Sequence, residues 1–82
     1  MIFDPFLTRL FLIEAFNEME LHRLCQHHFR DVFERFTPIM TKGEKVQVLL
    51  DHCERYGRMP QLLAVLESTR PVQYKQRFHL QV

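Results

Sequence analysis

Residues 41–71 read TKGEKVQVLLDHCERYGRMPQLLAVLESTRP, and this stretch decides the fold. Thr41 and Glu44 have the spacing of a capping box, in which each side chain accepts a hydrogen bond from the backbone N–H of the other residue. The apolar side chains that follow have the i, i+3, i+4, i+7 spacing of one helix face: Val46, Leu49, Leu50 and Cys53. We therefore predict a helix that begins after Thr41 and buries one side.

The same stretch predicts a tight turn and a second helix. Gly57 follows the first helix and supplies the left-handed conformation that commonly ends helices. Pro60 suits the first turn of the next helix, where its missing N–H is not needed. The second helix ends at Pro71, and its apolar side consists of Leu62, Leu63, Val65 and Leu66. The rest of the chain must cover the apolar face of this helical pair.

Length and composition favour one small helical domain. The chain has 82 residues and only two glycines, and no segment before the tail alternates as a half-buried strand does. We predict an all-α, compact bundle of about five helices. The helical domain spans residues 1–71, and residues 72–82 form a C-terminal tail or linker. For this tail three structures stay open: a linker to a further domain, an extended arm packed on the bundle, or a last helical turn.

The N-terminal segment predicts a helix that is unusually apolar. Asp4 is a typical N-cap and Pro5 a typical first helical residue, and the helix runs to about Phe16. Its apolar residues cover far more than one face of a helical wheel. Two interpretations stay open: the helix is central and buried on most sides, or part of it is an exposed patch for a partner. The candidate patch consists of Phe6, Leu10 and Phe11.

A second capping signal follows at Asn17, with Glu20 three residues later. Phe16 and Leu21 flank it at the spacing of a hydrophobic staple, and the helix it starts buries Leu21, Leu24 and Cys25. We expect a bend near residues 27–28, with one continuous helix to Phe36 as the alternative.

Thr37 and Pro38 end this helical segment, since a residue before proline disfavours helix. We expect Ile39 and Met40 to fill the core from the loop that follows.

Charge and termini limit the partners that we expect. Eleven basic residues face ten acidic ones, which argues against a protein dedicated to nucleic acid and leaves self-association unopposed by net charge. The start of the chain has no basic region or cleavage site, and the apolar run 6–16 is interrupted by charges and too short to cross a bilayer. We expect a cytoplasmic location and no membrane contact. The two cysteines, Cys25 and Cys53, fit reduced core residues, with a disulfide as the alternative.

Candidate chemistry is sparse. The mixture of His and Cys residues makes a zinc site a candidate. However, the chain has no C-x-x-C and no H-x-x-x-H pair among His22, Cys25, His27, His28, His52 and Cys53. A Cys–His nucleophile needs an accessible thiolate, whereas both cysteines fall on apolar faces. No glycine-rich phosphate loop is present. We therefore expect no catalysis, metal or cofactor.

A helix-turn-helix that binds DNA is the alternative function. The two helices around Gly57 have the right order, and Arg55, Arg58 and Arg70 are candidates for phosphate contacts. Against this interpretation, the second helix offers few base-reading groups: Gln61, Glu67, Ser68 and Thr69.

Two motifs resemble a known family. Residues 16–25, FNEMELHRLC, resemble the F-[S/N]-x-x-E-L-x-x-L-C opening of the bacterial effector-associated, death-like domains. Residues 49–62, LLDHCERYGRMPQL, resemble the second hallmark of that family, a helix that ends in an arginine-rich R-G-R-type turn before Pro and a Leu-rich helix. The resemblance covers roughly Leu12 to Pro71, although an aromatic-rich segment at 29–36 stands where the family commonly has a glycine-containing break.

The resemblance implies a non-catalytic adaptor. Such domains recruit similar death-like domains in the same or a partner protein, as a homo-oligomer or hetero-complex. They thereby couple a protease, TIR or NTPase effector to a sensor in bacterial immunity or programmed death. Assembly of this kind joins different patches head to tail.

We assign candidate partner-binding residues on this basis. The basic patch consists of Arg55, Arg58, Arg23 and Arg30, and the acidic patch of Glu18, Glu20, Asp31 and Glu34. The apolar anchors are Phe6, Leu10 and Phe11. Surface ion pairs contribute only ~0–1 kcal/mol each, so the charges set orientation more than affinity. For each charge the alternative is an ordinary solvated surface.

Overall fold

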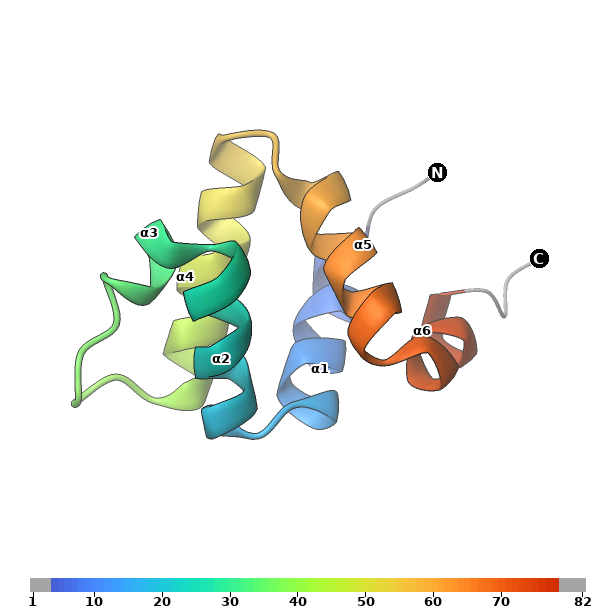
Figure 1. The fold of residues 1–82 in the computed structure, drawn as a ribbon, viewed down its shortest axis with the longest axis horizontal. Helices are drawn as coiled ribbons and strands as arrows, with labels where there is room; N and C mark the ends of the chain where they lie inside the picture. Colours follow the sequence, from blue (N-terminus) through green and yellow to red (C-terminus); the bar gives the residue numbers. More distant parts are fainter. Residues whose placement is uncertain (1–3, 79–82) are drawn as a thin grey trace.

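A computed structural model describes residues 4–78, in which the secondary structure consists of six helices and no strand (Figure 1). The prediction of an all-α bundle is confirmed, with one helix more than expected. The helices are α1 (Pro5–Ala15), α2 (Glu18–His28), α3 (Arg30–Phe33), α4 (Lys42–Arg55), α5 (Met59–Thr69) and α6 (Pro71–Phe78).

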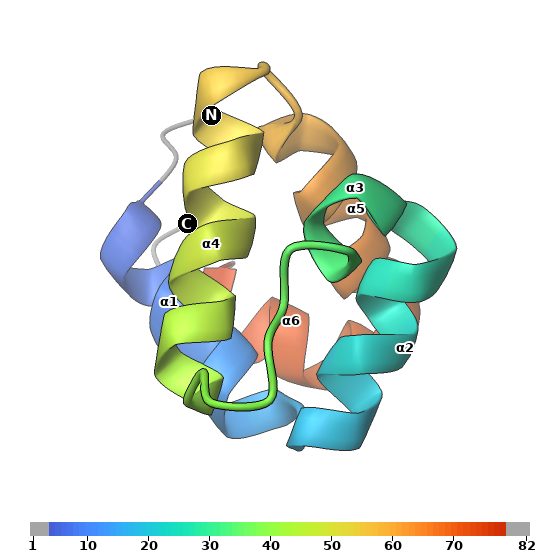
Figure 2. The ribbon, with the colours of Figure 1, turned by 90° about the vertical axis from the view of Figure 1, so that its left-hand side faces the viewer.

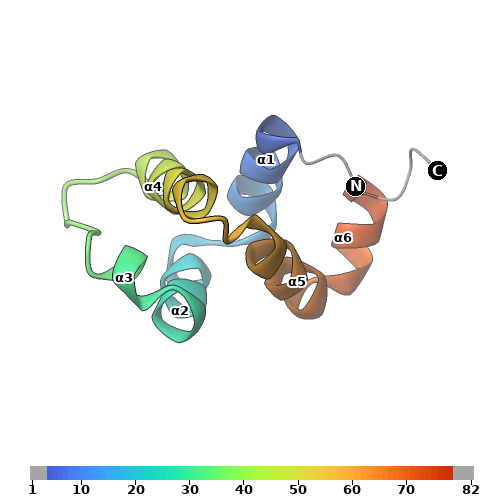
Figure 3. The ribbon, with the colours of Figure 1, turned by 90° about the horizontal axis from the view of Figure 1, so that it is seen from above.

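The four longest helices form two layers around one core. Figure 3 shows α1 and α4 on one side, α2 and α5 on the other, and α3 and α6 at the two ends. Helix α4 packs against α1, α3 and α5, and α6 packs against both α1 and α5. The centre is filled by side chains with no exposed surface, which include Leu12, Leu21, Cys25, Phe29, Val46, Leu49, Leu62 and Leu66.

The capping signals read from the sequence are present. Glu20 and Asn17 exchange hydrogen bonds, at 2.8 Å from Glu20 N to Asn17 Oδ1 and 2.9 Å from Asn17 N to Glu20 Oε1. Thr41 and Glu44 make the same reciprocal pair at the start of α4. Gly57 has φ +66°, so the turn between α4 and α5 requires the conformation that glycine adopts without strain.

The predicted bend near residues 27–28 is confirmed. Helix α2 ends at His28, and the next residue, Phe29, leaves helical geometry with φ −140° and ψ 60°. The Phe29 side chain is fully buried. The chain therefore turns at a point where an aromatic side chain reaches the core, and α3 starts in a new direction.

The loop between α3 and α4 differs from expectation. Ile39 is 91% exposed, so the prediction that it fills the core is wrong, whereas Met40 is half-buried and its sulfur accepts a hydrogen bond from Thr37 N–H. Figure 2 shows this loop running along the outside of the bundle from α3 to α4. Phe33 and Phe36, which precede this loop, pack against the core, whereas Ile39 does not.

The C-terminal segment is helical over the described residues. Pro71 follows the end of α5 and is the first residue of α6. Tyr74 is buried, with its ring centroid 6.2 Å from that of Phe11 and 4.7 Å from that of Phe78. Residues 71–78 are thus part of the bundle and not a linker, and residues 79–82 lie outside the described range.

Helix α1 combines the two interpretations left open by its sequence. Phe11 is only 1% exposed and packs edge to face against Phe16, so its place in the apolar patch for a partner is wrong. It is a core residue because α6 covers it. Leu10 is half-buried, whereas Phe6, in the first turn of the helix, is 66% exposed.

Two truncations separate core from surface on α1. Phe11→Ala should lower the free energy of unfolding by about 3–5 kcal/mol, because it removes a buried ring and leaves a cavity. Phe6→Ala is the matched control and should stay within about 0.5 kcal/mol of the wild type. Urea denaturation followed by circular dichroism measures both. Equal losses in the two variants would show that the ring of Phe11 is not part of the core.

Candidate functional site

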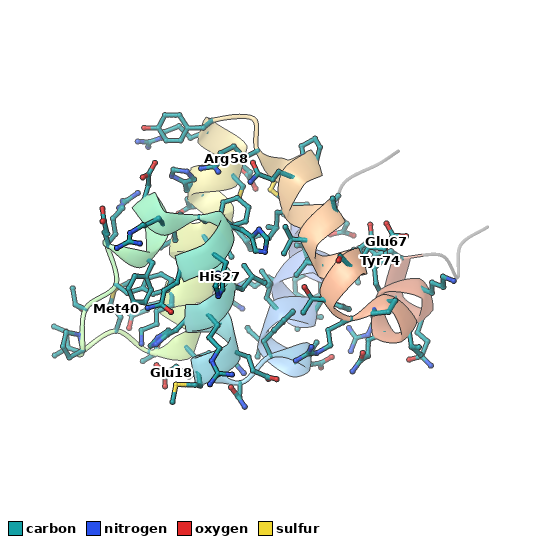
Figure 4. The ribbon with its side chains drawn as sticks, viewed as in Figure 1. Glu18, His27, Met40, Arg58, Glu67 and Tyr74 are labelled. Atoms are coloured by element: carbon teal, nitrogen blue, oxygen red, sulfur yellow. The ribbon has the colours of Figure 1, made fainter. Side chains whose placement is uncertain are left out.

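Arg58 fixes the turn between α4 and α5. Its guanidinium carbon lies 4.7 Å from the centroid of the Phe29 ring. Its Nη2 donates to the carbonyl of His28 at 3.2 Å, and its Nε donates to Gln61 Oε1 at 3.2 Å. The His28 carbonyl belongs to the last turn of α2, where helix carbonyls lack partners within the helix. Arg58 therefore connects the turn to the end of α2 (Figure 4).

His52 provides the fourth contact of Arg58. The Arg58 Nη1 atom lies 3.2 Å from His52 Nε2. Because a guanidinium only donates, this nitrogen accepts, and the neutral imidazole carries its proton on Nδ1. His52 is only 7% exposed, and its burial, then the charge of Arg58, lower the pKa of the imidazole. The ring also lies 4.8 Å from that of Tyr56.

A cavity of about 490 Å³ opens beside these residues. We call it the turn pocket, and its lining is Asp31, Arg35, His52, Tyr56 and Arg58. The two arginines outnumber the one carboxylate, and no ion pair within residues 4–78 involves Arg35 or Arg58. The pocket thus presents positive charge that the described part of the chain does not neutralise by direct pairing. Such a site suits a carboxylate or another anionic group.

The other basic candidates lie apart from this pocket or at its edge. Arg55 is exposed at the end of α4, and Arg23 is exposed on α2. Arg30 pairs with Glu34 at 3.7 Å between Nε and Oε2, and both side chains are largely exposed. Of the predicted basic set, only Arg58 lines the turn pocket.

Two of the four predicted acidic residues pair with distant residues within the domain. Glu18 pairs with Lys45, with 2.6 Å between Oε2 and Nζ, and Glu20 pairs with Arg70 at 2.6 Å. The hydrogen bond and charge of Lys45 lower the pKa of Glu18. The pKa of Glu20 is lowered chiefly by the N–H of Asn17. Both carboxylates are therefore engaged inside the domain. Within the acidic set Asp31 alone lines the turn pocket.

Sequence reasoning missed three residues that line the turn pocket, Arg35, His52 and Tyr56, and one buried cation elsewhere on α4, Lys45. A signal was present for two of them, because Lys45 and His52 lie on the apolar face of α4 at positions i and i+7. Polar side chains on such a face need partners. Lys45 has them in Glu18 and in His22, whose Nε2 lies 3.0 Å from its Nζ.

Nucleophilic and metal chemistry find little support here. Cys25 and Cys53 are buried free thiols, and burial raises their pKa to about 12 and about 11, so both are protonated at neutral pH. In the described range no three His, Cys, Asp or Glu side chains gather closely enough to bind a metal ion. No helix formed by residues 4–78 has the length and hydropathy of a membrane span.

The His52–Arg58 contact predicts a dependence of stability on pH. The folded-state pKa of His52 is lowered, so its neutral form stabilises the fold fully above the unfolded pKa of about 6.5. That contribution is lost progressively as the pH falls below this value. Between about pH 7.5 and about pH 5.5, the urea midpoint of unfolding should fall less for His52→Gln than for the wild type. The exposed control His27→Gln should keep the full drop. Equal drops in all three proteins would contradict this role.

A model of the family described as effector-associated domain 7 matches residues 7–71. Comparisons with curated proteins and with solved structures gave no match. The matched range includes most of α1, all of α2 to α5 and the turn at Gly57, and it ends where α6 begins. The resemblance inferred from the two sequence motifs is thereby confirmed. This chain, an effector-associated module, belongs to the effector-associated domain 7 family.

Proposed function

We propose that this module is a non-catalytic adaptor that binds similar death-like domains through the turn pocket and the adjacent Arg55. In this proposal it couples an attached or partner effector, of protease, TIR or NTPase type, to a sensor in bacterial immunity or programmed-death signalling. The family membership supports the association with an effector. The protonated thiols of Cys25 and Cys53 support a role without covalent catalysis.

The single observation that carries the proposal is the fixed position of Arg58. Four groups hold its guanidinium: the Phe29 ring, His52, Gln61 and the His28 carbonyl. None of them is a carboxylate, so the charge is oriented without being neutralised. A guanidinium held in this way loses little conformational entropy when an anionic group binds. This arrangement suits recognition of a partner better than it suits stability alone.

An exposed aromatic ring lies at the same site. Tyr56 lines the turn pocket and is 61% exposed. Tyrosine and arginine are enriched at protein interfaces, and both are frequent in their energetic centres. Tyr56 therefore replaces Phe11 as the candidate anchor, and Phe6 is a second exposed ring on α1, with Leu10 half-buried beside it.

The DNA-binding alternative loses support in the structure. Of the three arginines considered for phosphate contacts, Arg70 pairs with Glu20 and donates to the Ala15 carbonyl at 3.3 Å. Gln61, at the start of α5, bonds to Arg58 and lies 3.4 Å from the carbonyl of His28. Arg70 and Gln61 are thus engaged within the domain, and we propose no nucleic acid partner.

The proposed setting is the bacterial cytoplasm. Cys25 and Cys53 are free thiols, and unpaired cysteines are usual in a reducing compartment. The partners that we propose are similar domains, in a homo-oligomer or in a hetero-complex with another protein.

Charge reversal at the pocket tests this function. Arg58 is unsuitable because its loss would disturb the fold, so we choose Arg35→Glu and Arg55→Glu, both at exposed positions. Each should weaken self-association, or binding to a similar domain, by about tenfold, equivalent to about 1.4 kcal/mol. Sedimentation velocity measures the association, and circular dichroism should show an unchanged helical signal.

The matched control is Lys75→Glu on α6, an exposed position that changes net charge by the same amount. It should leave association as in the wild type. The proposed function is contradicted if both pocket variants bind like this control. It is also contradicted if the domain instead binds duplex DNA with the steep salt dependence of phosphate neutralisation.

A further inference from the structure

The outward face of α4 carries exposed carboxylates in a single row. Glu44, Asp51 and Glu54, with Gln47 between them, follow the i, i+3, i+7, i+10 spacing, and all four are exposed. The opposite side of the helix is buried in the core through Val46, Leu49, Leu50 and Cys53. The helix is therefore acidic on the side that faces away from the bundle.

These carboxylates are not neutralised by the described chain. No ion pair within residues 4–78 involves Glu44, Asp51 or Glu54. Glu44 accepts the backbone N–H of Thr41, and Asp51 accepts the side-chain amide of Gln47 at 2.9 Å. Both bonds come from neutral donors. The negative charge on this face is thus available to a cation from another molecule.

The turn pocket offers the complementary charge, but within one copy it faces a different direction. His52 and Tyr56, which line the pocket, are each two residues from Glu54, which corresponds to about 200° around a helix. Glu54 therefore points away from the pocket of its own chain. A contact between Glu54 and the pocket arginines requires two copies of the chain.

We infer that the acidic face of α4 in one copy docks in the turn pocket of a second copy, where Asp51 and Glu54 meet Arg35 and Arg58. This inference rests on the proposed function and names the two surfaces that perform it. The two surfaces differ, so the contact is heterologous and leaves a free surface of each kind on the resulting pair. Because its charges are solvent-exposed before docking, the contact is weak and salt-sensitive.

Two single reversals and their mixture test the inference. Glu54→Lys reverses one negative charge on the α4 face, and Arg35→Glu reverses one positive charge in the pocket. Each variant alone should self-associate about tenfold more weakly than the wild type in sedimentation velocity at low ionic strength. The equimolar mixture should regain association, because the intact pocket of the Glu54→Lys chain receives the intact α4 face of the Arg35→Glu chain. Glu67→Lys, at an exposed position on α5, is the matched control and should behave as the wild type.

The possible results separate this inference from the proposed function. If Arg35→Glu and Arg55→Glu weaken association but Glu54→Lys behaves like Glu67→Lys, then the α4 face is not the occupant and the inference is overturned, while the adaptor function stands. Failure of the mixture to associate also overturns it. A wild-type chain that stays monomeric at every concentration and binds no similar domain overturns both. Circular dichroism of each variant, with Glu54→Gln as a milder second substitution, confirms that the fold is intact.

Discussion

The structure depends most on the guanidinium of Arg58. It stacks on Phe29 and donates to the last turn of α2, while His52 accepts from it on α4. One side chain thus joins the turn, the end of α2 and the end of α4. A second cation joins the same two helices elsewhere, since buried Lys45 on α4 donates to Glu18 on α2 at 2.6 Å. Figure 4 labels Glu18 and Arg58 at opposite ends of this region. Removal of Arg58 would leave the buried imidazole of His52 without this partner, which is costly.

The contacts of Arg58 explain why the candidate site lies at the turn between α4 and α5. A cavity beside a mobile loop would require ordering when a partner binds, whereas the turn pocket is bounded by helix ends and by an arginine that the fold already orients. The neutral imidazole of His52 accepts from Arg58 and adds no charge of its own. The positive charge is therefore retained at the surface. The same bonds that stabilise the reversal between α4 and α5 also prepare the pocket for an anionic partner.

Local signals in the sequence predicted most of the helices. The contacts between side chains from different helices could not be predicted in the same way. The caps at Asn17 and Thr41 and the glycine at 57 act through neighbouring backbone, so their spacing is visible in the chain. The burial of Phe11 could not be decided from sequence because its cover, Tyr74 and Phe78, comes from a segment more than sixty residues away without a capping signal. Glu18 and Glu20 looked free for the same reason, since Lys45 and Arg70 reach them only in the folded bundle.

The central claim is that the turn pocket, with Arg58 held in place by the fold, is the surface that binds a similar domain. Its most direct test is a titration of isotope-labelled domain with unlabelled domain, followed residue by residue through the backbone amide resonances in NMR spectra. The account predicts that the largest shifts map to residues 31–35 and 52–58 around the pocket, with a second group on the outward face of α4. Shifts confined to α1 and α6, with the pocket unchanged, would contradict it.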